Sequence, residues 1–231
     1  MTETLVPGIW RIATTSRDAA FLVEGEDGLT LVDVGWANAY RPLLSAVEQL
    51  GRKPSDIRRI VLTHAHPDHV QGVARIRELT GARILGHPAE HAWLGAGRVP
   101  VQGRSGRAGR LLDRLPKLHW TPFAADDAVT DGQVLEGGAG LRVVHTPGHS
   151  PGHIALLHEP SRAVLVGDAL FHRGELGLGP AALAADPALR ADSLRALPPD
   201  LSAIGFAHGP AIAGSAVDVF HGWLADLPAD A

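Results

Sequence analysis

The stretch LTHAHPDHVQG, residues 62–72, constrains the fold more than any other part of the chain. It contains three histidines and one aspartate, namely His64, His66, Asp68 and His69. The apolar run Ile60-Val61-Leu62 directly before them predicts a buried strand. Because Pro67 bends the chain within the cluster, we expect a strand-to-helix loop that turns the four side chains toward one point. The sequence contains no cysteine, so imidazole and carboxylate groups remain for binding a metal.

Three further candidate residues each follow a predicted strand. They are His149 in HTPGHSPGH, Asp168 in LVGDALF and His208 in GFAHGPA. Loops at strand ends are where a rigid scaffold usually displays reactive groups. With the first cluster, these residues supply five imidazoles and two carboxylates, enough for two metal ions with open positions for water and substrate. A structural metal site would be closed, so this number of ligands favours catalysis.

Hydrophobic periodicity predicts strands and helices in two sets along the chain. Strands are expected at residues 8–14, 19–25, 29–35, 58–63, 82–87, 141–146, 153–159, 163–168 and 201–207. Helices are expected at residues 38–50, 73–81, 187–197 and 215–227, with a further helix beginning at residue 88. This order predicts two sheets packed against each other with helices outside. The Gly- and Arg-rich segment 95–117 is the part whose structure and role the sequence predicts least.

Length and charge restrict the class of protein. A chain of 231 residues predicts a single domain over residues 1–231, and its net charge of −4 argues against nucleic acid or membrane partners. The start MTETLVPGIW lacks the features of a secretory signal, and the longest uncharged stretch, 201–217, is interrupted by glycine, histidine and proline. We expect a cytoplasmic protein that acts on a small molecule. The oligomeric state stays open, and a homodimer is one of the alternatives.

In the order of its seven ligands, HxHxDH and then His, Asp and His, the chain resembles the metallo-β-lactamase-fold hydrolases over almost its whole length. The resemblance implies an α+β fold, a four-layer αβ/βα sandwich of two mixed β-sheets flanked by helices. Two divalent metal ions would lie at one edge of the sheets. Zinc is the expected metal, with iron or manganese as alternatives. The family pattern assigns His64, His66 and His149 to the first metal, Asp68, His69 and His208 to the second, and Asp168 as the bridge.

The resemblance also implies roles for residues around the metals. Asp33 matches a family position that orients the ligand loop without binding metal directly. A metal-bridging hydroxide would attack the carbonyl of an ester, thioester or lactone, and Asp68 would act as the catalytic proton shuttle. Phe171 and His172, which follow Asp168, are the expected substrate contacts.

Residues at single positions separate the branches of this family. The commonest class B β-lactamases have a cysteine where Asp168 stands, and the lactonases typically have a tyrosine where Phe171 stands. Glyoxalase II shares the seven ligands and a stretch like residues 167–171, but normally adds a C-terminal helical region that grips glutathione. Too little chain follows His208 for such a region. We therefore expect the compact, glyoxalase II-like, single-domain group.

Other activities of the same fold remain as alternatives. They are a lactonase, a phosphodiesterase and a mononuclear iron oxygenase of the persulfide dioxygenase kind. The dioxygenase resembles this fold but binds one iron, and it usually has a cysteine where His153 stands. We expect His153 to pack or hydrogen-bond near the site and not to bind metal. Metal analysis separates the hydrolase from the dioxygenase.

Overall fold

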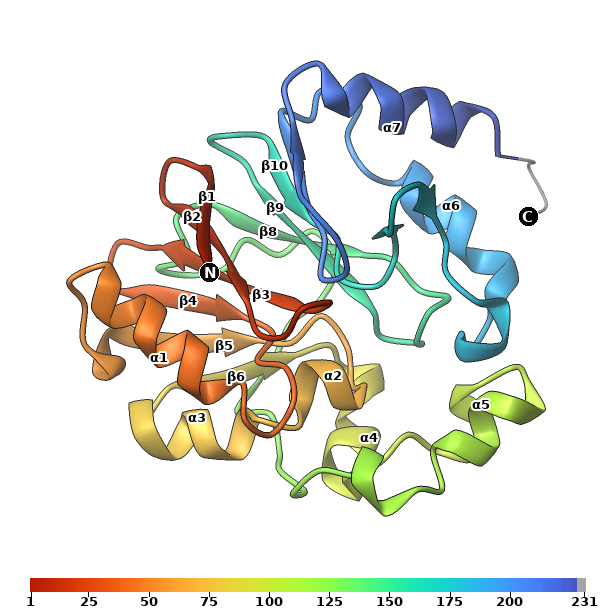
Figure 1. Cartoon of the computed structure of the whole chain (residues 1–231), viewed down its shortest axis with the longest axis horizontal. Helices are drawn as coiled ribbons and strands as arrows, with labels where there is room; N and C mark the ends of the chain where they lie inside the picture. Colours follow the sequence, from red (N-terminus) through yellow and green to blue (C-terminus); the bar gives the residue numbers. More distant parts are fainter. Residues whose placement is uncertain (228–231) are drawn as a thin grey trace.

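The computed structural model describes residues 1–227, so the end of the predicted domain, residues 228–231, lies outside the described residues. Two mixed β-sheets lie face to face, and helices cover their outer faces (Figure 1). This is the predicted four-layer αβ/βα sandwich. Along the described chain, no helix is both long enough and apolar enough to cross a lipid bilayer.

The first sheet has seven strands that pair in the order of the sequence. They are β1 (Thr2–Val6), β2 (Ile9–Ala13), β3 (Ala19–Glu24), β4 (Leu29–Val32), β5 (Ile57–Val61), β6 (Arg83–Gly86) and β7 (Asp127–Ala128). Strands β1 to β4 pair antiparallel, whereas β4 to β7 pair in parallel. Parallel neighbours need long crossover connections, and these contain α1 (Tyr40–Gln49), α3 (Val73–Thr80) and α4 (His91–Ala96).

The second sheet has five strands in the order β14-β13-β10-β9-β8. Their bounds are β8 (Leu141–His145), β9 (Ile154–His158), β10 (Ala163–Leu165), β13 (Ala203–Gly205) and β14 (Ile212–Ala213). A separate hairpin joins β11 (Phe171–His172) to β12 (Leu176–Gly177). Helices α6 (Arg190–Arg195) and α7 (Ala216–Ala225) lie on the outer side of this sheet (Figure 1).

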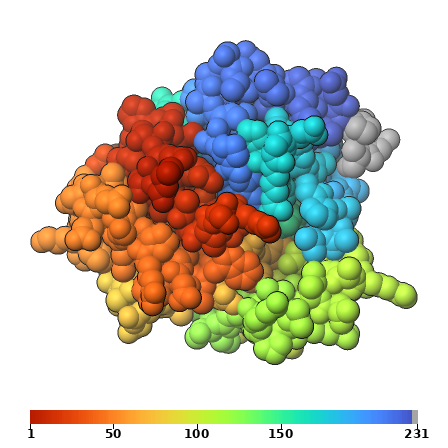
Figure 2. All heavy atoms as spheres, viewed as in Figure 1, coloured from red at the N-terminus to blue at the C-terminus, as the bar shows by residue number. Residues whose placement is uncertain are grey.

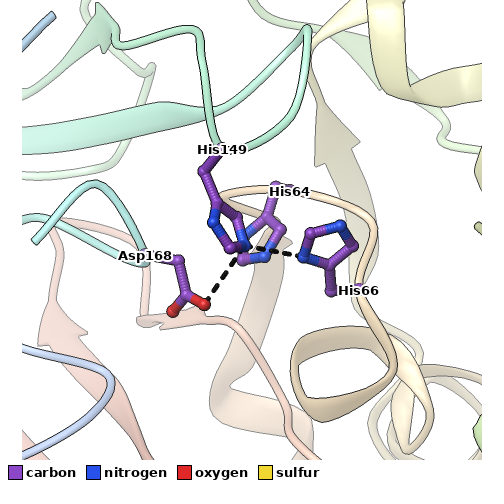
Figure 3. Close-up of side chains that lie close together, drawn as sticks. All are labelled: His64, His66, His149 and Asp168. Carbon is purple, nitrogen blue, oxygen red and sulfur yellow. Dashed lines mark hydrogen bonds and ion pairs between the residues drawn. The ribbon is translucent and has the colours of Figure 1, made fainter. Parts of the chain in front are cut away.

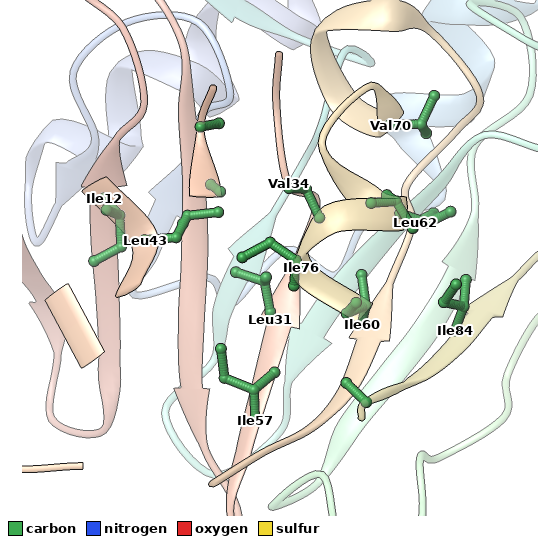
Figure 4. Packing of buried hydrophobic residues seen from close by; sticks show 14 of the residues in the cluster. Ile12, Leu31, Val34, Leu43, Ile57, Ile60, Leu62, Val70, Ile76 and Ile84 are labelled. Atoms are coloured by element: carbon green, nitrogen blue, oxygen red, sulfur yellow. The ribbon is translucent and has the colours of Figure 1, made fainter. Parts of the chain in front are cut away.

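Three hydrophobic clusters fill the spaces between the four layers. On β3, Leu22 enters the cluster shared with α1 and α3, while Phe21 and Val23 enter the cluster between the two sheets. Figure 4 shows the first of these clusters, in which Leu43 and Ile76 contribute from the helices. The third cluster packs the second sheet against α6 and α7. Because both faces of each sheet are covered, the central strands are nearly continuous apolar runs rather than alternating ones.

The structure confirms most predicted elements and differs at the ligand cluster itself. The predicted helix at 73–81 is α3, and Gly81 ends it in the left-handed conformation with φ of 73°. Strand β1 was not predicted. Asp68 and His69 do not lie in a loop as predicted: they belong to a short helix, α2 (Pro67–Val70), in which Pro67 takes the first helical position that suits its fixed φ.

The segment 95–117, whose structure the sequence left open, forms a wall beside the C-terminal half of the chain. It contains helix α5 (Arg107–Leu112). Ser105 donates its backbone N–H to the Ala184 carbonyl over 2.7 Å and its hydroxyl to the Ala181 carbonyl over 2.8 Å. In Figure 2 this yellow-green segment lies directly below the light-blue segment to which these alanines belong.

Candidate metal centre

Four connections that leave strands at one edge of the sandwich bring the seven predicted ligands together. The first follows β5 and carries the HxHxDH cluster, and the others follow β8, β10 and β13. Strands β10 and β13 are parallel neighbours, so Asp168 and His208 leave the second sheet at the same edge. Strand β8 runs in the same direction as β10 because each pairs antiparallel with β9 between them, which brings His149 to that edge as well.

The seven side chains form two donor groups that share Asp168. The groups are His64, His66, His149 and Asp168, and Asp68, His69, Asp168 and His208. Within each group, one ligand atom per residue lies within 4.8 Å of all the others. Asp168 Oδ2 lies 3.3 Å from His149 Nε2, while Oδ1 lies 3.1 Å from the Nε2 atoms of both His69 and His208. Each oxygen of this carboxylate therefore faces a different donor group. Figure 3 shows the first donor group.

The polar atoms of the first group fit a bound cation. His64 is fully buried, and its Nε2 has no hydrogen-bond partner among the described residues. His66 Nδ1 and His149 Nε2 lie only 2.7 Å apart, and both rings are buried. Buried polar atoms normally have partners, and imidazole nitrogens with carboxylate oxygens suit zinc and other divalent transition metals. The residues of the first group therefore fit such an ion.

Burial keeps the histidines of the first group neutral. It lowers the pKa of His64 and of His66 well below the ordinary value, and neighbouring cationic groups lower each pKa further. Burial also lowers the pKa of His149, to about 4, although the Asp168 carboxylate opposes this shift. A neutral imidazole has a free lone pair, which is the form that binds a metal.

The histidines of the second group face carboxylates and behave in the opposite way. Burial alone would lower the pKa of His208, but Asp168, Asp18 and Asp68 outweigh it and raise this pKa to about 12. Asp168 and Asp33 likewise outweigh burial and raise the pKa of His69. Protons on these rings therefore balance the carboxylates, and a metal that binds here must displace them.

Asp33 fixes the orientation of the ligand cluster through hydrogen bonds. It accepts the backbone N–H of Thr63 over 2.8 Å, the Thr63 hydroxyl over 2.7 Å and the Nδ1–H of His69 over 2.8 Å. Because the Thr63 hydroxyl donates to Asp33, its oxygen is left to accept the Nδ1–H of His64, 3.0 Å away. In neutral His64 Nε2 then carries the lone pair, and in His69 Nε2 does so once a metal has displaced its second proton. Asp33 itself has φ of 57°, a strained backbone conformation of the kind found at functional sites.

His153 lies beside the centre and hydrogen-bonds there, as predicted. Its Nε2 accepts the backbone N–H of Asp168 over 3.0 Å, so its Nδ1 carries the proton and donates to the Thr146 hydroxyl over 2.8 Å. His153 belongs to neither donor group. It holds the backbone of Asp168 in place.

Two buried or half-buried carboxylates that support the site were missed in the sequence. Asp18 lies 3.0 Å from His208 Nδ1 and also accepts Trp36 Nε1–H over 2.9 Å. Glu90 accepts the Ala65 N–H over 2.8 Å, and the Ser150 hydroxyl and Gly152 N–H over 2.7 Å each. Burial raises the pKa of Glu90, and these hydrogen bonds only partly oppose it. The local sequence around Asp18 or Glu90 does not distinguish either residue from a carboxylate on the surface.

A cavity of about 130 Å³ opens onto the two donor groups. Phe171 lines it and stacks on the His208 ring, with centroids 5.2 Å apart and planes 11° from parallel. Arg104, from the segment 95–117, lines it too and is ion-paired with Asp113 over 2.9 Å. His172 does not line this cavity: its Nδ1 donates to the Pro210 carbonyl over 2.8 Å, and its ring lines the neighbouring groove.

The chain matches known proteins over most of its length. The family model described as metallo-beta-lactamase superfamily matches residues 17–208, which include all seven predicted ligands. A hydroxyacylglutathione hydrolase of Cereibacter sphaeroides is 35% identical over 162 residues, which make up 69% of this chain and 50% of that protein. A probable metallo-hydrolase of Mycobacterium tuberculosis is 33% identical, over 67% of this chain and 57% of its own length. The chain thus spans about half the length of the curated relatives it matches.

Solved structures support the same fold. A metallo-beta-lactamase from Cronobacter sakazakii, a mutant of its HARLDQ motif, superposes with a TM-score of 0.70 at 25% identity, covering 90% of this chain and 80% of that one. A B3 metallo-beta-lactamase with an active-site glutamic acid gives a TM-score of 0.74 at 20% identity, covering 96% of this chain and 86% of the other. The second likeness bears on the fold alone.

Proposed function

Because this chain belongs to the metallo-beta-lactamase superfamily, we propose that it is a hydrolase that uses two divalent metal ions. The metal we propose is zinc, and the substrate is an ester, a thioester or a lactone. The observation that carries this proposal is the carboxylate of Asp168, whose two oxygens face two separate donor groups. A structural site would use a closed set of ligands around one ion. Here the ligands meet at the floor of a cavity that is open to substrate.

The assignment of ligands follows the two groups. His64, His66 and His149 would hold the first ion and Asp68, His69 and His208 the second, with Asp168 between them. When bound, the two ions would supply an activated water and polarise the substrate carbonyl. The hydrogen bonds of Asp33 and Thr63 hold Nδ1 of His64 and His69, so Nε2 is the nitrogen with which each ring would bind an ion.

Asp68 is the residue we assign to proton transfer. Burial raises its pKa, but the hydrogen bond with His208 and the nearby His69 outweigh burial, so the pKa is lowered and the carboxylate is ionised. Asp68 is also more exposed than the other ligands, with 25% of its side-chain surface accessible. It therefore can accept a proton from the attacking water and return it to the leaving group. Phe171, without a hydroxyl group, contributes an apolar wall for the substrate.

Among the three carbonyl substrates, the relatives favour the thioester. Several of the curated relatives are named hydroxyacylglutathione hydrolases, which supports a small acylated thiol as the substrate class. The 130 Å³ cavity suits a small acyl group.

The proposal is tested by metal analysis and a substrate panel. The protein is purified without added metal, its metal content is measured by mass spectrometry, and turnover is measured on thioesters, lactones, aryl esters, phosphodiesters and a cephalosporin. We expect about two zinc ions per chain and turnover of at least one carbonyl substrate. One iron per chain with oxygen uptake on glutathione persulfide would contradict the proposal, and so would turnover of phosphodiesters alone.

A further inference from the structure

The cavity over the donor groups is too small to enclose a complete substrate. Its volume is about 130 Å³, whereas pockets that enclose a small-molecule ligand typically measure roughly 300–1,000 Å³. The apolar residues Phe171, Leu178 and Leu183 form part of its wall. A substrate whose reacting carbonyl lies at the donor groups must therefore extend beyond this cavity.

A second cavity, which we call the basic groove, lies next to the first. Its volume is about 520 Å³. It is lined by Glu3, Arg11, Ser16, Arg17, His172, Arg173, Gly174, Gly209 and Pro210. Arg173 lines both cavities, so the two cavities are neighbours at this side chain. In Figure 2 the red N-terminal, teal and blue segments that contain these residues meet on the face shown.

The basic groove carries an excess of positive charge. Three arginines line it against one carboxylate, and that carboxylate, Glu3, lies 3.5 Å from Arg11. Within residues 1–227, the guanidinium groups of Arg17 and Arg173 have no ion-pair partner. The chain as a whole has a net charge of −4, so this local excess is not a reflection of overall composition. Unpaired guanidinium groups are suited to bind carboxylate or phosphate.

The groove is positioned relative to the metal centre by direct contacts. The Arg173 guanidinium carbon lies 5.4 Å from the centre of the Phe171 ring, and the same ring stacks on His208. His172 donates its backbone N–H to the His208 carbonyl over 3.0 Å. The lining of the groove is therefore joined to a predicted metal ligand through His172.

The geometry points to an anion subsite: Arg17 and Arg173 bind a carboxylate or phosphate carried by the thiol portion of the substrate, while the acyl group occupies the small cavity. This inference rests on the proposed thioester hydrolysis and narrows it to thioesters of anionic thiols. Neutral thioesters of the same length lack this contact and bind more weakly.

The test uses two matched pairs of acetyl thioesters on the zinc-loaded protein. One pair compares N-succinylcysteamine, which carries a carboxylate, with the neutral terminal amide of the same compound. The other compares phosphopantetheine with pantetheine. For at least one pair we expect the anionic thioester to have a kcat/KM about tenfold higher, mainly through KM, and we expect this ratio to fall toward one in the double variant Arg17→Gln/Arg173→Gln. The pair that shows the effect identifies the anion as carboxylate or phosphate.

Arg98→Gln is the matched control, because Arg98 is exposed and lines neither cavity. It should keep the wild-type ratio. High salt should reduce the ratio in the wild type, since exposed charges are screened. A ratio near one for both pairs in the wild type, or a ratio that the double variant leaves unchanged, would overturn the subsite.

A separate measurement distinguishes failure of the subsite from failure of the hydrolase. If the wild type hydrolyses none of the four thioesters, the proposed preference for thioesters is wrong. The subsite is then tested by calorimetry with the S-methyl thioethers of the same four thiols, which need no turnover. Binding of an anionic thioether to the wild type that is lost in the double variant would support the subsite on its own, and equal binding to both proteins would overturn it.

Discussion

At the residue scale, the candidate site depends on which nitrogen of each histidine carries the proton. His64, His69 and His208 each place Nδ1 within 3.0 Å of an oxygen of Thr63, Asp33 and Asp18 respectively. Such contacts hold a proton at Nδ1 and leave Nε2 to face the centre, where a metal would displace the second proton of His69 and His208. In His153 the roles are reversed, because its Nε2 accepts the Asp168 N–H. The neighbours of each ring thus separate ligands from a supporting histidine of the same residue type.

The depressed histidine pKa values predict that the protein without metal loses stability in mild acid. The pKa of His149 is about 4 in the folded state against the ordinary value of 6.5, so below pH 6.5 the unfolded chain binds a proton that the folded chain does not. Stability is therefore present above pH 6.5 and falls as the pH drops toward 4, by up to roughly 3 kcal/mol from this group. His64, His66 and His153 act in the same direction.

This prediction is checked by urea unfolding of chelator-treated protein at pH 7.5, 6 and 5. Glu90 has the opposite sign, since its raised pKa favours the folded state as it takes up a proton. His69 and His208 also have the opposite sign, because their pKa values are raised, but their stabilising contribution is essentially complete below pH 6.5. The four histidines with lowered pKa values therefore dominate between pH 6 and pH 5, and the free energy of unfolding should decrease over that step. An unchanged or higher value at pH 5 would show that the buried rings are not held neutral.

At the scale of elements, the site depends on contacts between loops that are far apart in the sequence. The turn Pro88–Glu90 follows β6 and presents Glu90 to the loop after β5 and to the loop after β8 at once. The loop at Gly209 is similarly joined to β11 through His172. The ligands are thus held in place by the connections between strands as well as by the strands.

Glu90→Gln tests the first of these contacts. Its carboxylate accepts hydrogen bonds at both oxygens, so the amide of glutamine would turn an NH₂ group toward a backbone or hydroxyl donor and leave that buried donor unpaired, at a cost of about 1–3 kcal/mol. We expect zinc affinity to fall by roughly 10–100-fold, measured by competition with a chromogenic chelator. Glu78→Gln, at an exposed position of α3, should keep the wild-type affinity. Equal affinities in all three proteins would exclude Glu90 from positioning the loops.

Gly209→Ala tests the second contact. Gly209 has φ of 119°, and a Cβ atom there would lie 1.7 Å from the His172 carbonyl oxygen, so the loop that carries His208 must move. We expect a loss of at least roughly 3 kcal/mol in the free energy of unfolding or, if the loop shifts, loss of one zinc ion. Gly214→Ala is the control, because Gly214 has φ of 59° but open space around it, and the left-handed conformation alone costs about 1–2 kcal/mol. Similar values for the two variants would contradict the close contact.

At the scale of the whole molecule, the sequence predicts those features of the fold that depend on a local pattern of residues. The apolar runs around Leu31 and Ile60 predict buried strands, and the ordered histidines and aspartates after them predict where the connections meet. The supporting residue Asp18 could not be predicted, because only the folded sheets bring it to His208. Strands of two residues, such as β11, show no periodicity, so the sequence did not predict that His172, an expected substrate contact, lines the basic groove and not the small cavity.

The fold also explains why one short cluster does not suffice for the chemistry. The first sheet contributes the HxHxDH cluster through the connection after β5, and the second contributes His149, Asp168 and His208. Neither sheet alone holds a complete donor group, since each group combines residues from both. Metal binding should therefore depend on the packing of the two sheets and stabilise the whole fold.

The central claim, a hydrolase with two metal ions that share Asp168, is tested most directly by a zinc titration. Zinc is added to chelator-treated protein while the hydrolysis of an acetyl thioester is followed. We predict that activity is absent without zinc, rises with zinc and levels off at two ions per chain. Full activity without metal, or a plateau at one ion per chain, would contradict the account.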